Sequence, residues 1–256
     1  MYRELTWNPV QPNGPTGVSY VSTAGVHLKG LGDIKVVQNW PGPVKDADLA
    51  WKTPSRIGYA SENPTLVKNN WGFEVSAKHK AFAWMKLLLD PEMSTRYDDP
   101  SLAASEGQGV LRLPPGRTAV DVCADFLTEV AIFAYKELIK EFGEDVVAVS
   151  PLEFWFTVPS VWSDRAKADT LRAAERAAKN AKVFQPLEAS IFLIREPEAA
   201  AVATISDIAK GGSTLQIKVR HHWTYVLCSI LILLHKPGDS VLVCDCGGGT
   251  VVSLRL

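Results

Sequence analysis

Residues 152–181 read LEFWFTVPSVWSDRAKADTLRAAERAAKNA and contain two kinds of secondary-structure pattern. The apolar, β-branched run at 152–158 is closed by Pro159, which predicts a buried strand. Ser163 can cap the segment that follows, and its Ala, Leu and Arg content favours a helix strongly. A second apolar strand is expected at residues 191–194. This alternation of strand and helix predicts an α/β architecture.

Similar patterns extend to the rest of the chain. Apolar residues recur every three or four positions over 118–142, and Gly143 is a stop signal, so we expect a long helix there. The same spacing predicts a helix over 78–89. Short apolar or β-branched runs predict strands at residues 18–22, 34–37, 55–60, 71–75 and 240–244.

The composition is that of a folded globular chain. Its 256 residues are 46% hydrophobic and 21% charged, enough for one large domain or two modest ones. The formal net charge of -1 does not imply a strong electrostatic attraction to nucleic acid or to an anionic membrane. The apolar run at 223–234 is shorter than the roughly 20 residues that span a bilayer. Few cysteines and no signal peptide predict a cytoplasmic location.

The strongest chemical signal is VLVCDCGGGT at residues 241–250. The strand delivers Asp245 to the sheet edge, and three glycines allow a tight turn whose N–H groups can surround an anion. Thr250 adds a hydroxyl donor, and Asp245 can hold Mg²⁺ directly or through water. The pattern predicts a nucleotide-phosphate site; the alternative is a hairpin turn with an incidental Asp. The P-loop and dinucleotide-binding signatures are both absent from the sequence.

Two segments precede this motif: FTVPSVWSDRAKADTLRAAERAA at 156–178 and IREPEAAAVAT at 194–204. With all three in this order, the chain resembles the heat shock protein 70 family of ATPase domains, within the actin and hexokinase superfamily. The N-terminal pieces resemble a divergent branch of that family: TGVSYV at 16–21, VVQNWPG at 36–42 and WGFEV at 71–75. The resemblance covers roughly residues 16–250.

The resemblance implies an actin-like ATPase (ribonuclease H-like) fold that binds ATP and Mg²⁺ between two lobes. Gly247, Gly248, Gly249 and Thr250 match the second phosphate loop, which contacts the terminal phosphates. Asp245 matches the carboxylate that organises Mg²⁺ and the attacking water. These assignments are expectations that the family pattern carries over to this chain.

Other positions of the resemblance lie farther from the glycines. Glu196 is similar to the acidic residue that helps to position the water. Pro159 matches the proline that couples nucleotide state to interdomain signalling, and Lys167, with Arg165 nearby, matches its basic relay partner. The alternative for Glu196 and Pro159 is that they are ordinary loop residues.

The chain also departs from the family pattern. A strand with Asp-x-Gly-Thr-Thr should precede Thr16, but residues 7–15 read WNPVQPNGP, with no Asp and no expected strand. The family's catalytic lysine cannot be aligned: Lys78, Lys80 and Lys86 lie in the right region, yet we expect them on a solvated helix face. Half of the phosphate clamp is therefore missing or remodelled.

We expect four parts in the chain. They are an irregular N-terminus (1–15), a first lobe (16–212, with an inserted subdomain at about 56–112), an atypical apolar insertion (213–237) and the first strands of a second lobe (238–256). We interpret residues 219–237, and the residues after Val251, as translated intron or a mis-assembled gene. By the resemblance, we expect the rest of the second lobe to be missing from this sequence.

The expected function is that of an ATP-binding, chaperone-like ATPase domain, present as an incomplete fragment with weak or no turnover. Its expected partners are nucleotide, co-chaperones and client proteins. The alternative is a non-catalytic remnant or interaction module that keeps the first-lobe fold. Cys244 and Cys246 form a CxC pair without a second pair at usable spacing, so we expect no zinc.

Overall fold

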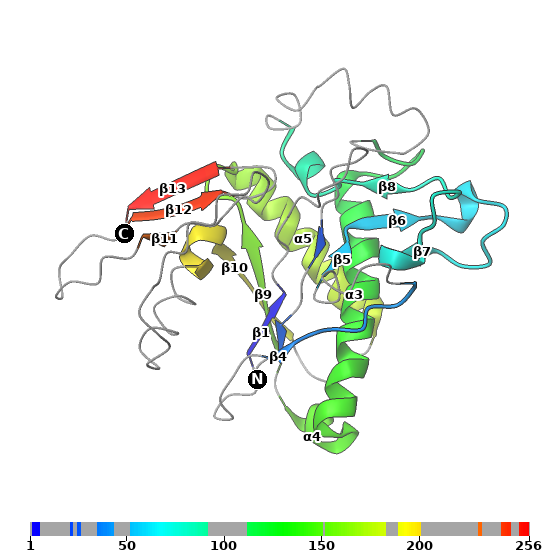
Figure 1. Ribbon diagram of the computed structural model, residues 1–256, viewed down its shortest axis with the longest axis horizontal. Coiled ribbons are helices and arrows are strands. Elements are labelled where there is room, and N and C mark those ends of the chain that lie inside the picture. The colour runs from blue at the N-terminus through cyan, green and yellow to red at the C-terminus, as the bar shows by residue number, and fades with distance from the viewer. Residues whose placement is uncertain are drawn as a thin grey trace, which may run out of the picture.

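A parallel three-stranded sheet lies at the centre of the protein (Figure 1). The computed structural model describes residues 2–5, 21–22, 25–26, 35–43, 52–91, 112–150, 152–182, 189–200, 230–231, 242–246 and 251–255. Strand β9 (Leu152–Val158) is central, with β1 (Tyr2–Leu5) and β10 (Ala189–Arg195) parallel to it on either side. Because Arg195 lies opposite Val158, β9 and β10 end together at one edge of the sheet.

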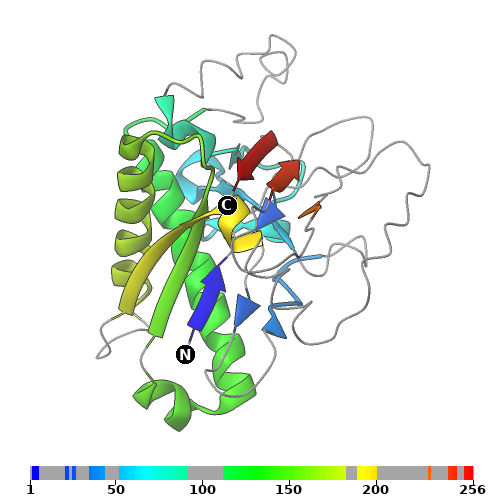
Figure 2. The same cartoon turned by 90° about the vertical axis from the view of Figure 1, so that its left-hand side faces the viewer.

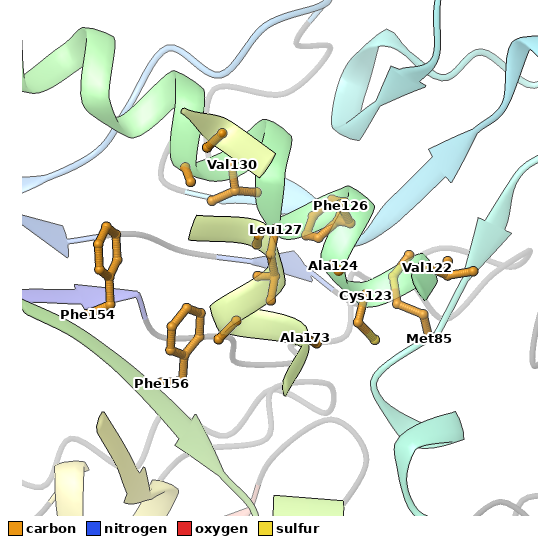
Figure 3. Packing of buried hydrophobic residues seen from close by; sticks show 14 of the residues in the cluster. Met85, Val122, Cys123, Ala124, Phe126, Leu127, Val130, Phe154, Phe156 and Ala173 are labelled. Carbon is orange, nitrogen blue, oxygen red and sulfur yellow. The ribbon is translucent and has the colours of Figure 1, made fainter. Parts of the chain in front are cut away.

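Two long helices pack against one face of this sheet (Figure 2). They are α3 (Ala119–Phe142) and α5 (Asp164–Ala181), and the short α4 (Glu144–Val149) follows α3. Figure 3 shows Phe154 and Phe156 of β9 on the side of α3 that carries Leu127 and Val130. The buried face of α5 consists largely of alanines, which allow the helices to pack closely: Ala166, Ala173, Ala174, Ala177 and Ala181.

A capping box starts α3. The Thr118 hydroxyl accepts the backbone N–H of Asp121 at 3.2 Å, and the Asp121 carboxylate accepts the N–H of Thr118 at 2.7 Å. The backbone N–H of Thr118 contributes most to lowering the pKa of Asp121, and Arg176 of α5 lowers it further through an ion pair. The cap therefore provides a hydrogen-bond acceptor for a backbone N–H in the first turn of α3, and the Asp121–Arg176 ion pair connects this turn to α5.

Thr118→Ala should lower the free energy of unfolding by about 1 kcal/mol, because it leaves a helix N–H without its cap. The matched control is Thr128→Ala on the same helix, since the Thr128 hydroxyl donates only to the Ala124 carbonyl. Urea unfolding measures both. Equal costs for the two variants would contradict a stabilising cap.

A second, antiparallel sheet packs beside α3. Its central strand β6 (Arg56–Gly58) pairs with β7 (Asn70–Trp71) and with β8 (Phe82–Ala83). The Tyr59 hydroxyl donates to Asp125 of α3 at 2.9 Å, which links this sheet to the helix. The remaining elements are β2 (Val21–Ser22) paired with β5 (Thr53–Pro54), β3 (Gly25–Val26) paired with β4 (Lys35–Val36), the sheet β11 (Ile230–Leu231), β12 (Leu242–Cys246) and β13 (Val251–Arg255), and the 3₁₀ helices η2 (Ala60–Glu62), η3 (Gly72–Glu74) and η4 (Leu87–Leu89).

Three expectations about secondary structure are wrong. The strand expected over 71–75 ends at Trp71, because β7 covers Asn70–Trp71 and the 3₁₀ helix η3 covers Gly72–Glu74. The helix expected over 78–89 is instead β8 followed by η4, because Phe82 pairs with Ile57 of β6 and Trp84 has a φ of 62°, which an α-helix excludes. The N-terminus expected to be irregular over 1–15 contains β1, which the parallel ladder with β9 holds. The helix ending before Gly143, the helix capped by Ser163 and the strands before and after it are confirmed.

Candidate functional site

A buried ion pair lies at the carboxyl edge of the parallel sheet. The Lys86 ammonium is 2.7 Å from Oε1 of Glu196, and their side chains are only 7% and 4% exposed. The ammonium also donates to the carbonyl of Thr157 at 3.2 Å. Three segments far apart in the sequence therefore meet here: the residues between β8 and η4, the end of β9 and the residue after β10.

The turn after β9 forms one wall of this site. The indole ring of Trp162 lies 5.6 Å from the Lys86 ammonium, centroid to Nζ, and Trp162 is 3% exposed. The backbone N–H of Trp162 donates to the Pro159 carbonyl at 3.2 Å, which closes the turn. The N–H of Ser163 then donates to the buried Asp90 carboxylate at 3.3 Å, so this turn is joined to the segment that carries Lys86.

Three unsatisfied polar atoms lie at the end of β9 and in the turn that follows it. Within the described ranges, the Thr157 hydroxyl, the Ser160 hydroxyl and the Trp162 indole N–H are buried without a hydrogen-bond partner. A buried polar group left unpaired costs about 1–3 kcal/mol. The end of β9 and the turn after it thus offer hydroxyl and N–H groups that can hydrogen-bond to a polar ligand or to water.

The Lys86 charge also acts on the core behind the site. Met85 lies beside Val122 and Cys123 of α3 (Figure 3), and Cys123 is completely buried. Burial raises the pKa of the Cys123 thiol, and the positive charge of Lys86 lowers it in part. The site is therefore packed directly against the main hydrophobic core.

The structure brings together two of the residues predicted from the sequence. Glu196 begins the helical residues 196–200 and is buried in the ion pair, and Pro159 is buried at the end of β9. Lys167 lies apart: it pairs with Asp164 at 3.1 Å in the first turn of α5, with its side chain 35% exposed. The relay role of Lys167 stays a prediction.

The aspartate–glycine motif is described only in part. Asp245 lies in β12 opposite Val252 of β13, so these strands form an antiparallel hairpin joined by residues 247–250. Gly247, Gly248, Gly249 and Thr250 themselves lie outside the described residues. In both views, the hairpin lies beyond the carboxyl ends of β9 and β10 (Figures 1 and 2). Both interpretations of this motif, a phosphate-binding loop and a hairpin turn with an incidental Asp, therefore stay predictions.

The sequence reasoning missed Lys86. We expected Lys78, Lys80 and Lys86 on a solvated helix face; Lys78 is exposed and Lys80 forms a surface pair with Glu62, but Lys86 is buried. One signal was available: Lys86 is the single charged residue in AFAWMKLLL, residues 81–89. A charge inside such an apolar run is rarely buried without a partner.

Comparison with known proteins assigns no family. No protein-family model matches the chain, and no curated protein sequence matches it. Across the described ranges, no helix combines the length and apolar character that crossing a bilayer requires. In the same ranges, no cluster of three or more His, Cys, Asp or Glu side chains could bind a metal ion.

Proposed function

We propose that the chain is an ATP-binding domain of the heat shock protein 70 type, with Lys86 and Glu196 at the terminal phosphates. The observation that carries this proposal is the buried Lys86–Glu196 pair at the carboxyl edge of β9 and β10. In open α/β sheets, ligands bind at the carboxyl ends of the strands. The pair also includes the glutamate that the resemblance assigns to water positioning.

The burial of the pair supports a functional role. A buried ion pair is often no more stable than well-packed apolar residues, because desolvation offsets the attraction between the charges. The Lys86 ammonium can bind a phosphate oxygen, and the Glu196 carboxylate can orient a water molecule or accept its proton. The unpaired hydroxyl and N–H groups at Thr157, Ser160 and Trp162 suit an oxyanion.

Mg²⁺ would neutralise charge on the phosphates, and Asp245 is the residue that we propose to hold it, on sequence grounds. Residues 7–15 provide no first phosphate loop, so we propose nucleotide binding with weak or no hydrolysis. Cytoplasmic location is a further proposal that rests on the low number of cysteines. Co-chaperones and client proteins are proposals that rest on the resemblance alone.

Isothermal titration of Mg-ATP tests the proposal. The wild type should bind, and Asp245→Asn should weaken binding at least about tenfold, or 1.4 kcal/mol, because it removes the carboxylate proposed to hold Mg²⁺. Glu62→Gln is the matched control, because Glu62 pairs with Lys80 at the surface, and its affinity should equal that of the wild type. Circular dichroism verifies that every variant is folded.

The second candidate is a non-catalytic remnant or interaction module with the first-lobe fold. The sequence of residues 7–15, which lacks the Asp-Gly pattern, favours it. This candidate predicts no detectable heat when millimolar Mg-ATP is added to folded wild-type protein. That result would overturn the proposed nucleotide site.

A further inference from the structure

Trp162 and Lys86 form a buried cation–aromatic contact. The 5.6 Å between Nζ and the ring centroid is within the range of about 6 Å in which a cation is attracted to an aromatic face. Both side chains are almost completely inaccessible to water. Because desolvation strengthens such contacts, this one should be stronger than a similar contact at the surface.

The backbone around Trp162 is held from two sides. The backbone N–H of Trp162 donates to the Pro159 carbonyl and closes the turn. The next residue, Ser163, donates its backbone N–H to the Asp90 carboxylate, and its hydroxyl caps α5. Asp90 follows η4, four positions after Lys86. The indole and the lysine therefore belong to two segments that a partly buried hydrogen bond connects.

The polar edge of the indole does not explain why a tryptophan occupies this position. Within the described part of the chain, its indole N–H has no hydrogen-bond partner, a cost that phenylalanine or leucine would avoid. The ring face, in contrast, is close to the ammonium. Tryptophan has the strongest cation–aromatic attraction of the three aromatic side chains.

We propose that Trp162 is a positioning residue for Lys86, holding the ammonium at the carboxyl edge of the sheet without neutralising it. A lysine side chain loses up to about 2 kcal/mol of rotamer entropy when it is fixed. Glu196 and the Thr157 carbonyl take two of its three N–H donors, and the ring restrains it further. A second carboxylate would restrain the ammonium as well, but together with Glu196 it would give the site a net negative charge, which disfavours an anionic ligand.

The phosphate role of Lys86 belongs to the proposed function, so the first experiment uses no nucleotide. The full chain is labelled with ¹³C at the lysine ε-carbons, and Lys86→Arg assigns the signal of Lys86. Ring currents should shift the Lys86 ε-methylene protons upfield of all the other lysines in the wild type. Trp162→Phe should keep a smaller upfield shift, and Trp162→Leu should abolish it.

Trp155→Leu is the matched control. Trp155 lies on the same strand as Thr157 but stacks on Phe192, with ring centroids 4.6 Å apart, so its loss should leave the Lys86 signal unchanged. A wild-type Lys86 signal within the range of the other lysines would overturn the proposal. This criterion holds even where Trp162→Leu does not fold.

Mg-ATP titration of the same variants provides the second readout. Trp162→Leu should bind about tenfold more weakly than the wild type, and Trp162→Phe should bind within about threefold of it. Equal affinity in folded Trp162→Leu, with the ring-current shift lost, would overturn the positioning role. Absence of binding to the wild type would overturn the proposed function, while the spectra still decide whether Trp162 positions Lys86.

Discussion

Lys86→Met should lower the free energy of unfolding by about 3–5 kcal/mol, because it leaves the Glu196 carboxylate buried without its counter-charge. The Glu196 side chain is 4% exposed, so water cannot replace the lost ammonium. The Thr157 carbonyl also loses a hydrogen bond from Lys86. Urea unfolding near neutral pH measures the effect.

The double variant Lys86→Met/Glu196→Leu should recover most of this loss. Apolar residues of similar size can replace a buried ion pair at little net cost, so we expect stability within about 1 kcal/mol of the wild type. The same variant should not bind Mg-ATP, which separates the stability of the site from its proposed function. Nucleotide binding by this folded variant would contradict our assignment of the pair.

A surface pair provides the matched control for Lys86→Met. Lys80 pairs with Glu62, and its side chain is 47% exposed. Lys80→Met should therefore cost no more than about 1 kcal/mol. Equal costs at the two positions would show that burial of the Lys86–Glu196 pair has no energetic consequence.

Stability should fall steeply in alkaline solution. Burial raises the pKa of the Cys123 thiol. The pKa of the Tyr59 hydroxyl is also raised, mainly by burial and then by the nearby Asp125 carboxylate. In the unfolded chain, these groups ionise near about pH 8.5 and pH 10. Above those values the unfolded chain binds fewer protons than the folded protein, so each group lowers the free energy of unfolding by about 1.4 kcal/mol per pH unit.

The full stability is therefore present below about pH 8.5 and decreases as the pH rises. Urea unfolding between about pH 8 and pH 11 should show a flatter decline for Cys123→Ala from the lower end of this range. Tyr59→Phe should flatten the decline only near its upper end. Identical slopes for the wild type and Cys123→Ala would contradict the burial of a protonated thiol.

Local patterns predicted the central βαβ unit well. Ser163 and Gly143 are typical helix-boundary residues, and the apolar, β-branched run between them predicts the strand β9. Glu196 emerged only from the resemblance to a family. For the βαβ unit, the decisive signal lies within a few residues of the feature that it predicts. For Glu196, the signal is the order of three motifs spread over residues 156–250.

Lys86 could not be placed in this way. The apolar spacing over 78–89 matches a helix, but pairing of β8 with a strand about 25 residues earlier overrides it. The partner of Lys86 is 110 positions away, and no local pattern encodes that contact. The buried ion pair therefore required the tertiary structure.

This separation has a consequence for how the protein assembles. During synthesis the ribosome releases the ammonium-bearing segment long before the carboxylate that matches it, and long-range pairing delays folding. Until β10 docks on β9, a nascent chain has a lysine that only solvent or a chaperone can accommodate. We therefore expect the ion pair to form only after Glu196 has been synthesised, late in the folding of this sheet.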